Sequence, residues 1–474
     1  MKKYFAAACL IMTATAARSA DLPIKAPAYK AEVAQIYDWT GFYAGMNVGV
    51  GVGQNKAMNA TPAANVFTRF NMSPFGAAGG GQIGYNYLFG RWVLGAEADI
   101  QGITEPSSAL PPACAVACRS TGQTLSWFGS VRGRLGYATG PVLSYVTGGL
   151  AYGDVKTGQL LVLNGIPESF RTDQLRTGWT LGSGVEAALG GNWTGKIEYL
   201  YIDLGHMSDD FVLGGRGRTF SSDIREHVFR AGVNYRLGGT TTAWAAAPTA
   251  NWNRFYVGGN GGFGIARDRV VQSIPSFAIS DSFSQQPRGF IGGVQAGYNW
   301  QSTNWVLGIE TDIQGSTQKD DRSCFVNCVQ PVIQDTEKLS WLGTVRGRIG
   351  YDIGHTLFYA TGGLAYGQVK TTITENFGST TVTELQHTKA GWTAGAGIES
   401  PLEFLGWFGK NWTTKTEYLY VDLGSTADAY TTMVGAGGGF AGFPIGHTYS
   451  TTVREHIFRT GLNYHFDAPL IAKY

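Results

Sequence analysis

Hydrophobic and polar side chains alternate along most of this chain with a period of two residues, which is the pattern of β-strands with one apolar face. In residues 125–137 one face carries Trp127 and Leu135, and the other face carries Arg132 and Arg134. Runs of ten to fourteen alternating residues are long for strands of a soluble protein. The pattern therefore predicts an all-β protein with long strands.

The first half of the chain offers eight such segments, and the links between them alternate in length. Links of two residues alternate with long ones near 55–74, 103–122, 157–174 and 206–223. Short turns on one side and long loops on the other are typical of an antiparallel β-barrel in the outer membrane. The predicted strands lie near 41–54, 75–88, 91–102, 123–138, 142–156, 175–189, 193–205 and 224–237.

The second half of the chain repeats the first. Residues 125–157 return without a gap at 339–371, with 23 of 33 positions identical. Each copy is far longer than the 20–50 residues of solenoid or propeller repeats, so each is a complete domain. We predict two tandem eight-stranded antiparallel transmembrane β-barrels, 39–237 and 252–466, joined by a linker at 238–251. The alternative is one sixteen-stranded porin barrel that encloses a water channel.

Alternation alone does not show which face points inward, but three features place the apolar face outside. Aromatic residues such as Trp92, Tyr201 and Tyr235 cluster at strand ends, as in membrane-interface girdles. The opposite face is rich in glycine and balanced in charge, which suits a narrow lumen. The strands also have the length of tilted membrane spans.

The N-terminus has the features of a secretory signal peptide at residues 1–20, with two lysines, an apolar stretch and a small-residue exit. We assign 21–38 to a periplasmic segment and 467–474 to a C-terminal tail. Without the signal the chain carries 33 basic and 34 acidic residues, which does not resemble the charge of a nucleic-acid-binding protein. No stretch reaches the 18 apolar residues of a transmembrane helix.

Nine charged residues on the inner face of each copy match in type between the copies. They form either a selectivity or proton-relay path or a structural network that fills the lumen, and the small size of an eight-stranded barrel favours the network. Buried charges must pair. The residues are Glu97, Asp99, Arg132, Arg134, Glu186, Lys196, Glu198, Glu226 and Arg230 in copy one, and Glu310, Asp312, Arg346, Arg348, Glu399, Lys415, Glu417, Glu455 and Arg459 in copy two.

Four cysteines form two CxxxC pairs in equivalent external loops, Cys114 with Cys118 and Cys324 with Cys328. An exported chain favours a disulfide within each loop, although free thiols or a metal pair are alternatives. No histidine lies nearby at a zinc-binding spacing.

Histidines offer little sign of a ligand site. His227 and His456 occupy equivalent strand positions and are expected to be interfacial or packing residues. Three others lie in or beside the predicted loops, where a haem or metal could dock. They are His206, His387 and His447.

No enzyme motif recurs in the two copies, and no metal or other cofactor is predicted. GGGQIG at 79–84 matches the letters of a dinucleotide fingerprint, but it begins inside a predicted strand and is therefore accidental.

Several segments of both copies resemble an alphaproteobacterial family of outer-membrane proteins often labelled immunogenic or porin-like. These segments include WTGFYAG, SWFGSVRGRLGY, YVTGGLAYG and WTGKIEYLYIDLG. The resemblance implies OmpA-type eight-stranded barrels in the cell outer membrane and, in some relatives, haem binding or host contact. The tandem arrangement departs from the single barrel of a typical member.

We therefore expect an outer-membrane protein, not an enzyme, with a structural, surface-interaction or weak-permeability role. Passive diffusion through a sixteen-stranded porin and haem binding or adhesion at the surface are the alternatives. The expected partners are outer-membrane lipid and lipopolysaccharide, with a host surface or haem as further candidates and no nucleic acid.

Overall fold

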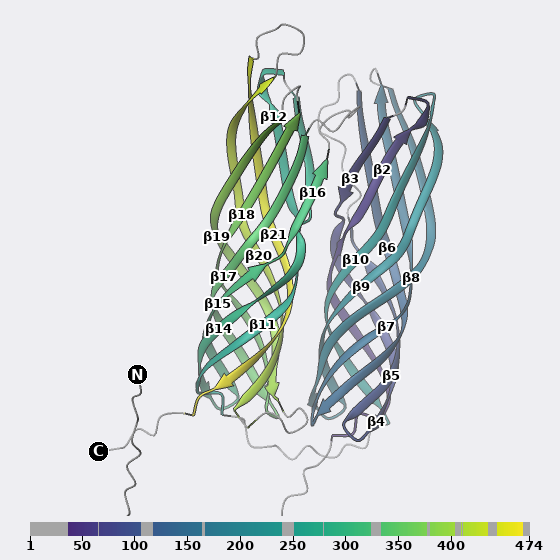
Figure 1. Ribbon diagram of the computed structural model, residues 1–474. Coiled ribbons are helices and arrows are strands. Elements are labelled where there is room, and N and C mark those ends of the chain that lie inside the picture. Colours follow the sequence, from purple (N-terminus) through teal and green to yellow (C-terminus); the bar gives the residue numbers. More distant parts are fainter. Residues whose placement is uncertain are drawn as a thin grey trace, which may run out of the picture. The chain divides into compact units, whose positions relative to one another are not determined.

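The computed structural model confirms an all-β protein (Figure 1). It describes residues 37–64, 66–105, 117–163, 166–238, 251–277, 279–323, 333–376, 380–402, 409, 411–434 and 443–467. The predicted signal peptide, nearly all of the linker and the end of the predicted tail lie outside these residues. No helix within the described ranges has the length and apolar character needed to cross a membrane.

Eight long strands of the first copy form one antiparallel sheet, to which a short hairpin is added. The long strands are β1 (Gly41–Gly53), β4 (Phe75–Phe89), β5 (Trp92–Ile103), β6 (Ala117–Thr139), β7 (Val142–Leu163), β8 (Ile166–Gly190), β9 (Trp193–Leu213) and β10 (Arg216–Leu237). The hairpin consists of β2 (Asn55–Thr61), the 3₁₀ turn η1 (Pro62–Ala64) and β3 (Val66–Met72).

The second copy has the same plan with one additional short strand. Its long strands are β11 (Phe255–Ala266), β14 (Arg288–Ser302), β15 (Trp305–Ser316), β17 (Ile333–Ile353), β18 (Thr356–Asn376), β19 (Thr380–Pro401), β20 (Trp412–Val434) and β21 (Phe443–His465). The added elements are β12 (Asp268–Ile274), η2 (Pro275–Phe277), β13 (Ile279–Gln285) and β16 (Lys319–Ser323).

Each copy closes on itself. β1 pairs with β10 from Phe42 opposite Leu237 to Gly53 opposite Glu226. β11 pairs with β21 in the same way. The prediction of two separate eight-stranded barrels is confirmed, and the alternative of one sixteen-stranded sheet is wrong.

The outer wall of each barrel carries an apolar belt between two aromatic girdles. Belt residues such as Val48, Ile83 and Leu150 are 69%, 64% and 70% exposed. The girdles are built from cross-strand tryptophan–tyrosine pairs. In copy one these are Trp92–Tyr137 and Trp193–Tyr235 near the two-residue turns, and Trp127–Tyr152 and Trp179–Tyr201 at the other border. The counterparts in copy two are Trp305–Tyr351, Trp412–Tyr464, Trp341–Tyr366 and Trp392–Tyr420.

Where the structure describes them, the predicted long external loops are mostly strands, and that part of the prediction is wrong. β7 continues to Leu163 and β8 begins at Ile166, while only Gly214 and Gly215 separate β9 from β10. Beyond the upper girdle the outer wall faces water, so outward aliphatic residues become scattered, such as Leu175, Val212 and Val382, although the strands continue. Without a continuous apolar outer face, these segments have the sequence character of loops.

The barrel interior is layered. The predicted charges lie between the girdles, and an apolar layer lies above them at the level of the upper girdle. Its members in copy one include Phe128, Leu200 and Val228, each with an exposure of 0%. Copy two repeats this layer with Leu342, Leu419 and Ile457. The upper extensions hold further apolar clusters, so side chains fill each barrel at three levels.

Candidate functional sites in the barrels

Arg132 is the centre of the charge network in the first barrel. Its guanidinium contacts Glu97, lies 2.8 Å from Asp99 Oδ2 and lies 3.1 Å from Glu198 Oε1. These four side chains, from strands β5, β6 and β9, are fully buried. Because one arginine faces three carboxylates, removing it would leave several buried charges without a partner.

Arg230 and Lys196 provide the other positive charges that neutralise the three carboxylates around Arg132. Arg230 Nε donates to Glu198 Oε2 at 2.6 Å, and its Nη2 lies 2.9 Å from Asp99 Oδ2. Lys196 Nζ donates to both oxygens of Glu97, at 3.1 and 3.0 Å. The alternation of residues along β5, β9 and β10 places all these groups on the inner face.

Arg134 connects the network to a second layer nearer the two-residue turns. Its Nη2 donates to Glu186 Oε2 at 2.7 Å and its Nη1 to the Tyr43 hydroxyl at 2.7 Å. The guanidinium carbon lies 3.9 Å from the centre of the Tyr145 ring. Tyr43 in turn donates to Glu97 at 2.8 Å. The network is thus hydrogen-bonded across the lumen.

The second barrel builds the same network from its matching residues. Arg346 contacts Glu310 and lies 3.0 Å from Asp312 and 3.1 Å from Glu417. Arg459 Nη2 lies 2.7 Å from Asp312 Oδ2 and Lys415 Nζ lies 2.7 Å from Glu310 Oε1, while Arg348 Nη1 lies 2.8 Å from Glu399 Oε2.

Glu226 and Glu455 point inward but do not join this network, which corrects the predicted set. Within the described part of the chain, neither forms an ion pair. Glu455 Oε2 instead accepts a hydrogen bond from Gln318 at 2.9 Å. Both glutamates lie one position beyond the upper girdle. In copy one the girdle residue Tyr201 pairs with His227, and the next pair along β9 is Ile202 with Glu226. Each network therefore holds four acids and four bases rather than five and four.

The sequence reasoning missed the tyrosines that take part. Tyr43 and Tyr145 in copy one, and Tyr256 and Tyr359 in copy two, donate to network glutamates. The signal for Tyr43 was its position in β1, where it shares the inner face with Gly45 and Gly49. A Cβ added at Gly45 would lie 2.1 Å from Asn234 Oδ1, so glycine leaves room there for polar side chains.

A second acidic cluster occupies the upper extension of the second barrel. Glu337, Asp268 and Glu455 are buried, and no described cation forms an ion pair with them. Thr451 Oγ1 donates to Glu337 Oε1 at 3.3 Å, and Glu337 is hydrogen-bonded to Asp268. Burial raises the pKa of Glu337 to about 8. This carboxyl is therefore protonated in the folded protein at neutral pH.

Stability of this extension is expected to fall as the pH rises through neutrality. The unfolded chain releases the Glu337 proton near its ordinary pKa of 4.5, whereas the folded protein holds it up to about pH 8. The contribution of the protonated Glu337 carboxyl to the free energy of unfolding is therefore fully present below about pH 4.5 and is lost as the pH approaches 8. Hydrogen exchange of residues 333–340 between pH 5 and 8.5, corrected for intrinsic rates, would measure it. We expect Glu337→Gln to remove at least about 1 kcal/mol of this pH dependence.

Glu384→Gln is the matched control, because the Glu384 side chain is 58% exposed on β19 of the same extension. An unchanged pH dependence in Glu337→Gln, or an equal change in Glu384→Gln, would contradict the assignment.

The three histidines predicted to lie near loops lie in strands and have partners of their own. His206 Nδ1 lies 2.9 Å from Asp223 Oδ1. His387 Nε2 lies 3.0 Å from Asp428 Oδ2, and His447 Nε2 lies 2.8 Å from the Thr432 hydroxyl. The described residues contain no group of three or more metal-ligating side chains placed to hold a metal ion.

His227 and His456 occupy matching positions, as predicted from sequence. The Tyr199 hydroxyl lies 2.8 Å from His227 Nδ1, and the Tyr418 hydroxyl lies 2.7 Å from His456 Nδ1. Each predicted disulfide includes a cysteine outside the described residues, so the Cys114–Cys118 and Cys324–Cys328 disulfides stay predictions. The GGGQIG segment lies within β4, as expected for an accidental match.

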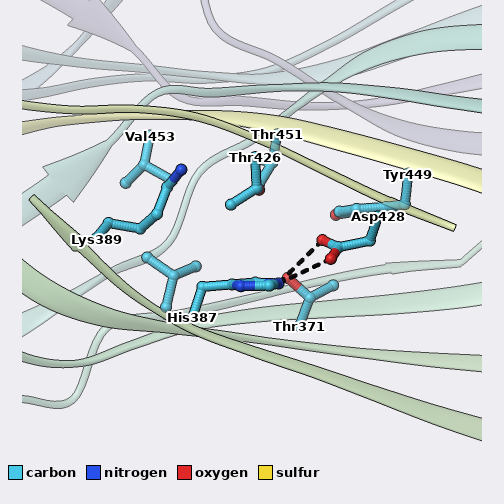
Figure 2. Close-up of a pocket in the computed structure, with 9 residues that line it drawn as sticks. Thr371, His387, Lys389, Thr426, Asp428, Tyr449, Thr451 and Val453 are labelled. Atoms are coloured by element: carbon cyan, nitrogen blue, oxygen red, sulfur yellow. Dashed lines mark hydrogen bonds and ion pairs between the residues drawn. The ribbon is translucent and has the colours of Figure 1, made fainter.

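A small pocket lies in the upper extension of the second barrel (Figure 2). His387 and Lys389 of β19 line one side, and Thr426 and Asp428 of β20 line the other. Its volume of about 10 Å³ gives room for one water molecule. The other lining residues are Val369, Thr371, Tyr449, Thr451 and Val453.

The counterpart of Thr426 in the first barrel is Met207, which is 1% exposed. The longer methionine side chain occupies the space that is open beside Thr426. Thr426→Met is therefore the natural substitution for filling the pocket.

Comparisons with known proteins agree with this architecture. The outer membrane protein beta-barrel domain matches residues 6–236 and again residues 237–466. The 31 kDa outer-membrane immunogenic protein of Brucella melitensis is 36% identical over 244 residues, which cover 50% of this chain and 100% of that protein. A 22 kDa outer membrane protein of Rhizobium leguminosarum is 34% identical over 179 residues, covering 38% of this chain and 67% of that protein.

Among solved structures, the attachment invasion locus protein Ail of Yersinia pestis aligns over 40% of this chain and 99% of its own length. Its identity of 13% and TM-score of 0.19 are too low to bear on function.

The two domain matches together span almost the whole chain, and each includes one closed barrel. The relatives are named as outer-membrane proteins, and the apolar belts and girdles are those of membrane-spanning barrels. This chain therefore belongs to the outer-membrane β-barrel protein family and is a tandem member of it, located in the outer membrane.

Proposed function

We propose that the protein is a non-conducting outer-membrane anchor whose two strand-built extensions provide surfaces for contact outside the cell. The observation that carries the proposal is the filled interior. In each barrel four acidic and four basic side chains pair across the lumen, and the side chains in these ion pairs are at most 3% exposed. An eight-stranded barrel is just wide enough to be filled in this way.

The extensions support the contact role. The ends of β6 to β10, and of β17 to β21, run well past the upper girdles, so a large part of each barrel lies beyond the membrane. A purely structural membrane plug would need only about 9–11 residues per strand. The belts contact outer-membrane lipid, and the walls above them contact lipopolysaccharide, as the partners of this anchor.

Planar-bilayer recordings test the sealed interior. We expect the purified full-length protein to insert without producing a steady conductance, because charge pairs and the apolar layer block the lumen. Insertion would be verified by the heat-dependent gel shift of the recovered protein, and a known porin in the same bilayers would serve as the positive control. A steady conductance that grows with salt concentration would contradict the proposal and restore a permeability role.

A further inference from the structure

Both barrels have a seam in their wall immediately above the upper girdle. β8 pairs with β9 from Gly190 opposite Trp193 up to Trp179 opposite Asp203, and the pairing ends there. β19 pairs with β20 only up to Trp392 opposite Asp422. Above these points residues 166–178 face 204–213, and residues 380–391 face 424–434, without backbone pairing between them. Their other edges stay paired with β7, β10, β18 and β21.

A β-bulge at the start of each seam explains why the strands part. The register of β9 against β10 shifts beside Gly205, which has φ +78°, and that of β20 against β21 shifts beside Gly424, with φ +71°. Asp203 Oδ1 accepts a hydrogen bond from the Gly205 amide at 2.9 Å. A bulge bends and twists its strand, here away from the neighbour on the other side.

The same bulge is built into both copies. Asp422 Oδ1 accepts from the Gly424 amide at 2.8 Å, and Asp203 and Asp422 each accept at 3.2 Å from an arginine Nε, that of Arg225 or Arg454. The repeated YLYIDLG and YLYVDLG segments thus specify a break in the barrel wall.

The two seams are bridged at equivalent positions near the base, where Arg176 donates to the His206 carbonyl in the first barrel and Lys389 to the Ser425 carbonyl in the second, but they differ toward the tip. In the first barrel the Phe170 and Phe211 rings stack at 4.3 Å, Gln174 donates to Asp209 at 2.7 Å, and Glu168 accepts from the Gly214 amide at 2.6 Å. These contacts extend to the tip of the seam. In the second barrel the polar bridges are His387 to Asp428 and Lys389 to the Ser425 carbonyl, both near the base. Three residues of these bridges, His387, Lys389 and Asp428, line the pocket of Figure 2.

The edge of β19 has the character of a strand that can accept another. In an antiparallel strand every second residue directs its N–H and C=O to the same side, so residues 380–391 present a row of backbone donors and acceptors to the seam. Residues 380–383 are threonine or valine with no proline, which favours the extended conformation. Both edges carry charged residues, Glu384 and Lys389 in β19 and Arg171 and Asp173 in β8, but only the edge of β8 also contains a proline, Pro167, which discourages strand addition.

We propose that the seam of the second barrel binds an extended peptide segment of a partner protein by β-strand addition to residues 380–391. In this binding mode the main chain supplies affinity and pockets for alternate side chains supply specificity. The pocket beside Thr426 takes one small side chain of the incoming strand, such as alanine or serine. This inference rests on the proposed contact role of the extensions and names the kind of partner.

A peptide copied from this chain is a suitable probe. Residues 367–376 of β18 already pair with β19 on its other edge, from Gly367 opposite Lys389 to Asn376 opposite Thr380. The control is the same peptide with alternate backbone nitrogens methylated on the pairing side, which keeps every side chain but cannot form the ladder. Hydrogen exchange of residues 380–391 in the full-length protein in detergent would report binding.

We expect the unmodified peptide to slow exchange of these amides at least several-fold and the methylated peptide to have no effect. His387→Ala, which removes a bridge, should strengthen binding, whereas Thr426→Met, which fills the pocket, should weaken binding of a peptide with alanine at the pocket position. Lys319→Ala is the matched control, because the Lys319 side chain is 53% exposed on β16 and lies outside the seam.

Unchanged exchange at saturating peptide, in both the wild type and His387→Ala, would overturn the inference, as would equal protection by both peptides. Each variant would first be checked for the folded barrel by its gel shift. The bilayer recordings are independent of this experiment. A steady conductance would contradict the proposed sealed interior, whereas a seam that binds no peptide would contradict only the inference of strand addition.

Discussion

Replacing Arg132 with alanine is expected to destabilise the first barrel by about 3–5 kcal/mol. Arg132 contacts Glu97, Asp99 and Glu198 in a fully buried site, so its loss leaves carboxylates in the lumen without their main partner. Glu198→Ala should have a comparable effect, because Arg132, Arg230 and the Tyr145 hydroxyl all bond to Glu198. Urea titration of the folded protein in detergent, followed by the gel shift, would measure both.

Arg171→Ala is the control for Arg132→Ala, since Arg171 is exposed on the outer side of β8 and should contribute less than about 1 kcal/mol. Arg346→Ala offers a second comparison, because it removes the same centre from the other barrel. A cost below about 1 kcal/mol for Arg132→Ala would mean that its lumen is wide and wet, which would also weaken the proposal of a sealed interior.

The first copy is expected to fold without the second. Residues 21–238 contain all eight strands and both partners of the closing pair β1 and β10, so every backbone edge within the membrane is satisfied. Expressed alone and refolded into detergent, this fragment should show the gel shift of a folded barrel. We expect folding of the fragment to be all or none, because an open sheet in lipid leaves a row of backbone N–H and C=O groups without partners.

Residues 21–215 form the matched control, since this fragment lacks β10 (Arg216–Leu237) and cannot close. The shorter fragment should stay unfolded under the same conditions. Failure of residues 21–238 to fold where the full chain refolds would show that one copy depends on the other, despite the closed pairing.

The inner faces could be predicted from sequence because alternation is a local property. Arg132 and Arg134 occupy every second position of β6, and Trp127 and Leu135 occupy the positions between, so the two faces follow from the strand geometry alone. The duplication then revealed the interior set, since the same charge types recur in both copies. Even the closing strand pairs were predictable from the count of eight segments per copy.

The partners of those charges were not predictable in the same way. Glu226 has the same face and charge as Glu198, yet only Glu198 joins the network, since Glu226 lies beyond the upper girdle. Which residues share a level depends on the stagger of strands around the closed barrel. Tyr43 was missed for a related reason, because tyrosine fits both a girdle and a polar lumen.

The sequence by itself determined the fold class, the duplication and the inward-facing charges, because each depends on residue types at short, regular spacing. Only the tertiary structure decided that the predicted loops are strands, since beyond the membrane the outer face is mostly polar and the regular apolar alternation is lost. It also decided where the wall opens, because the bulge at Asp203 and Gly205 bends β9 away from the neighbouring strand β8. Local patterns specify the strands and their faces, whereas register, closure and the seam arise from contacts between residues far apart in the chain.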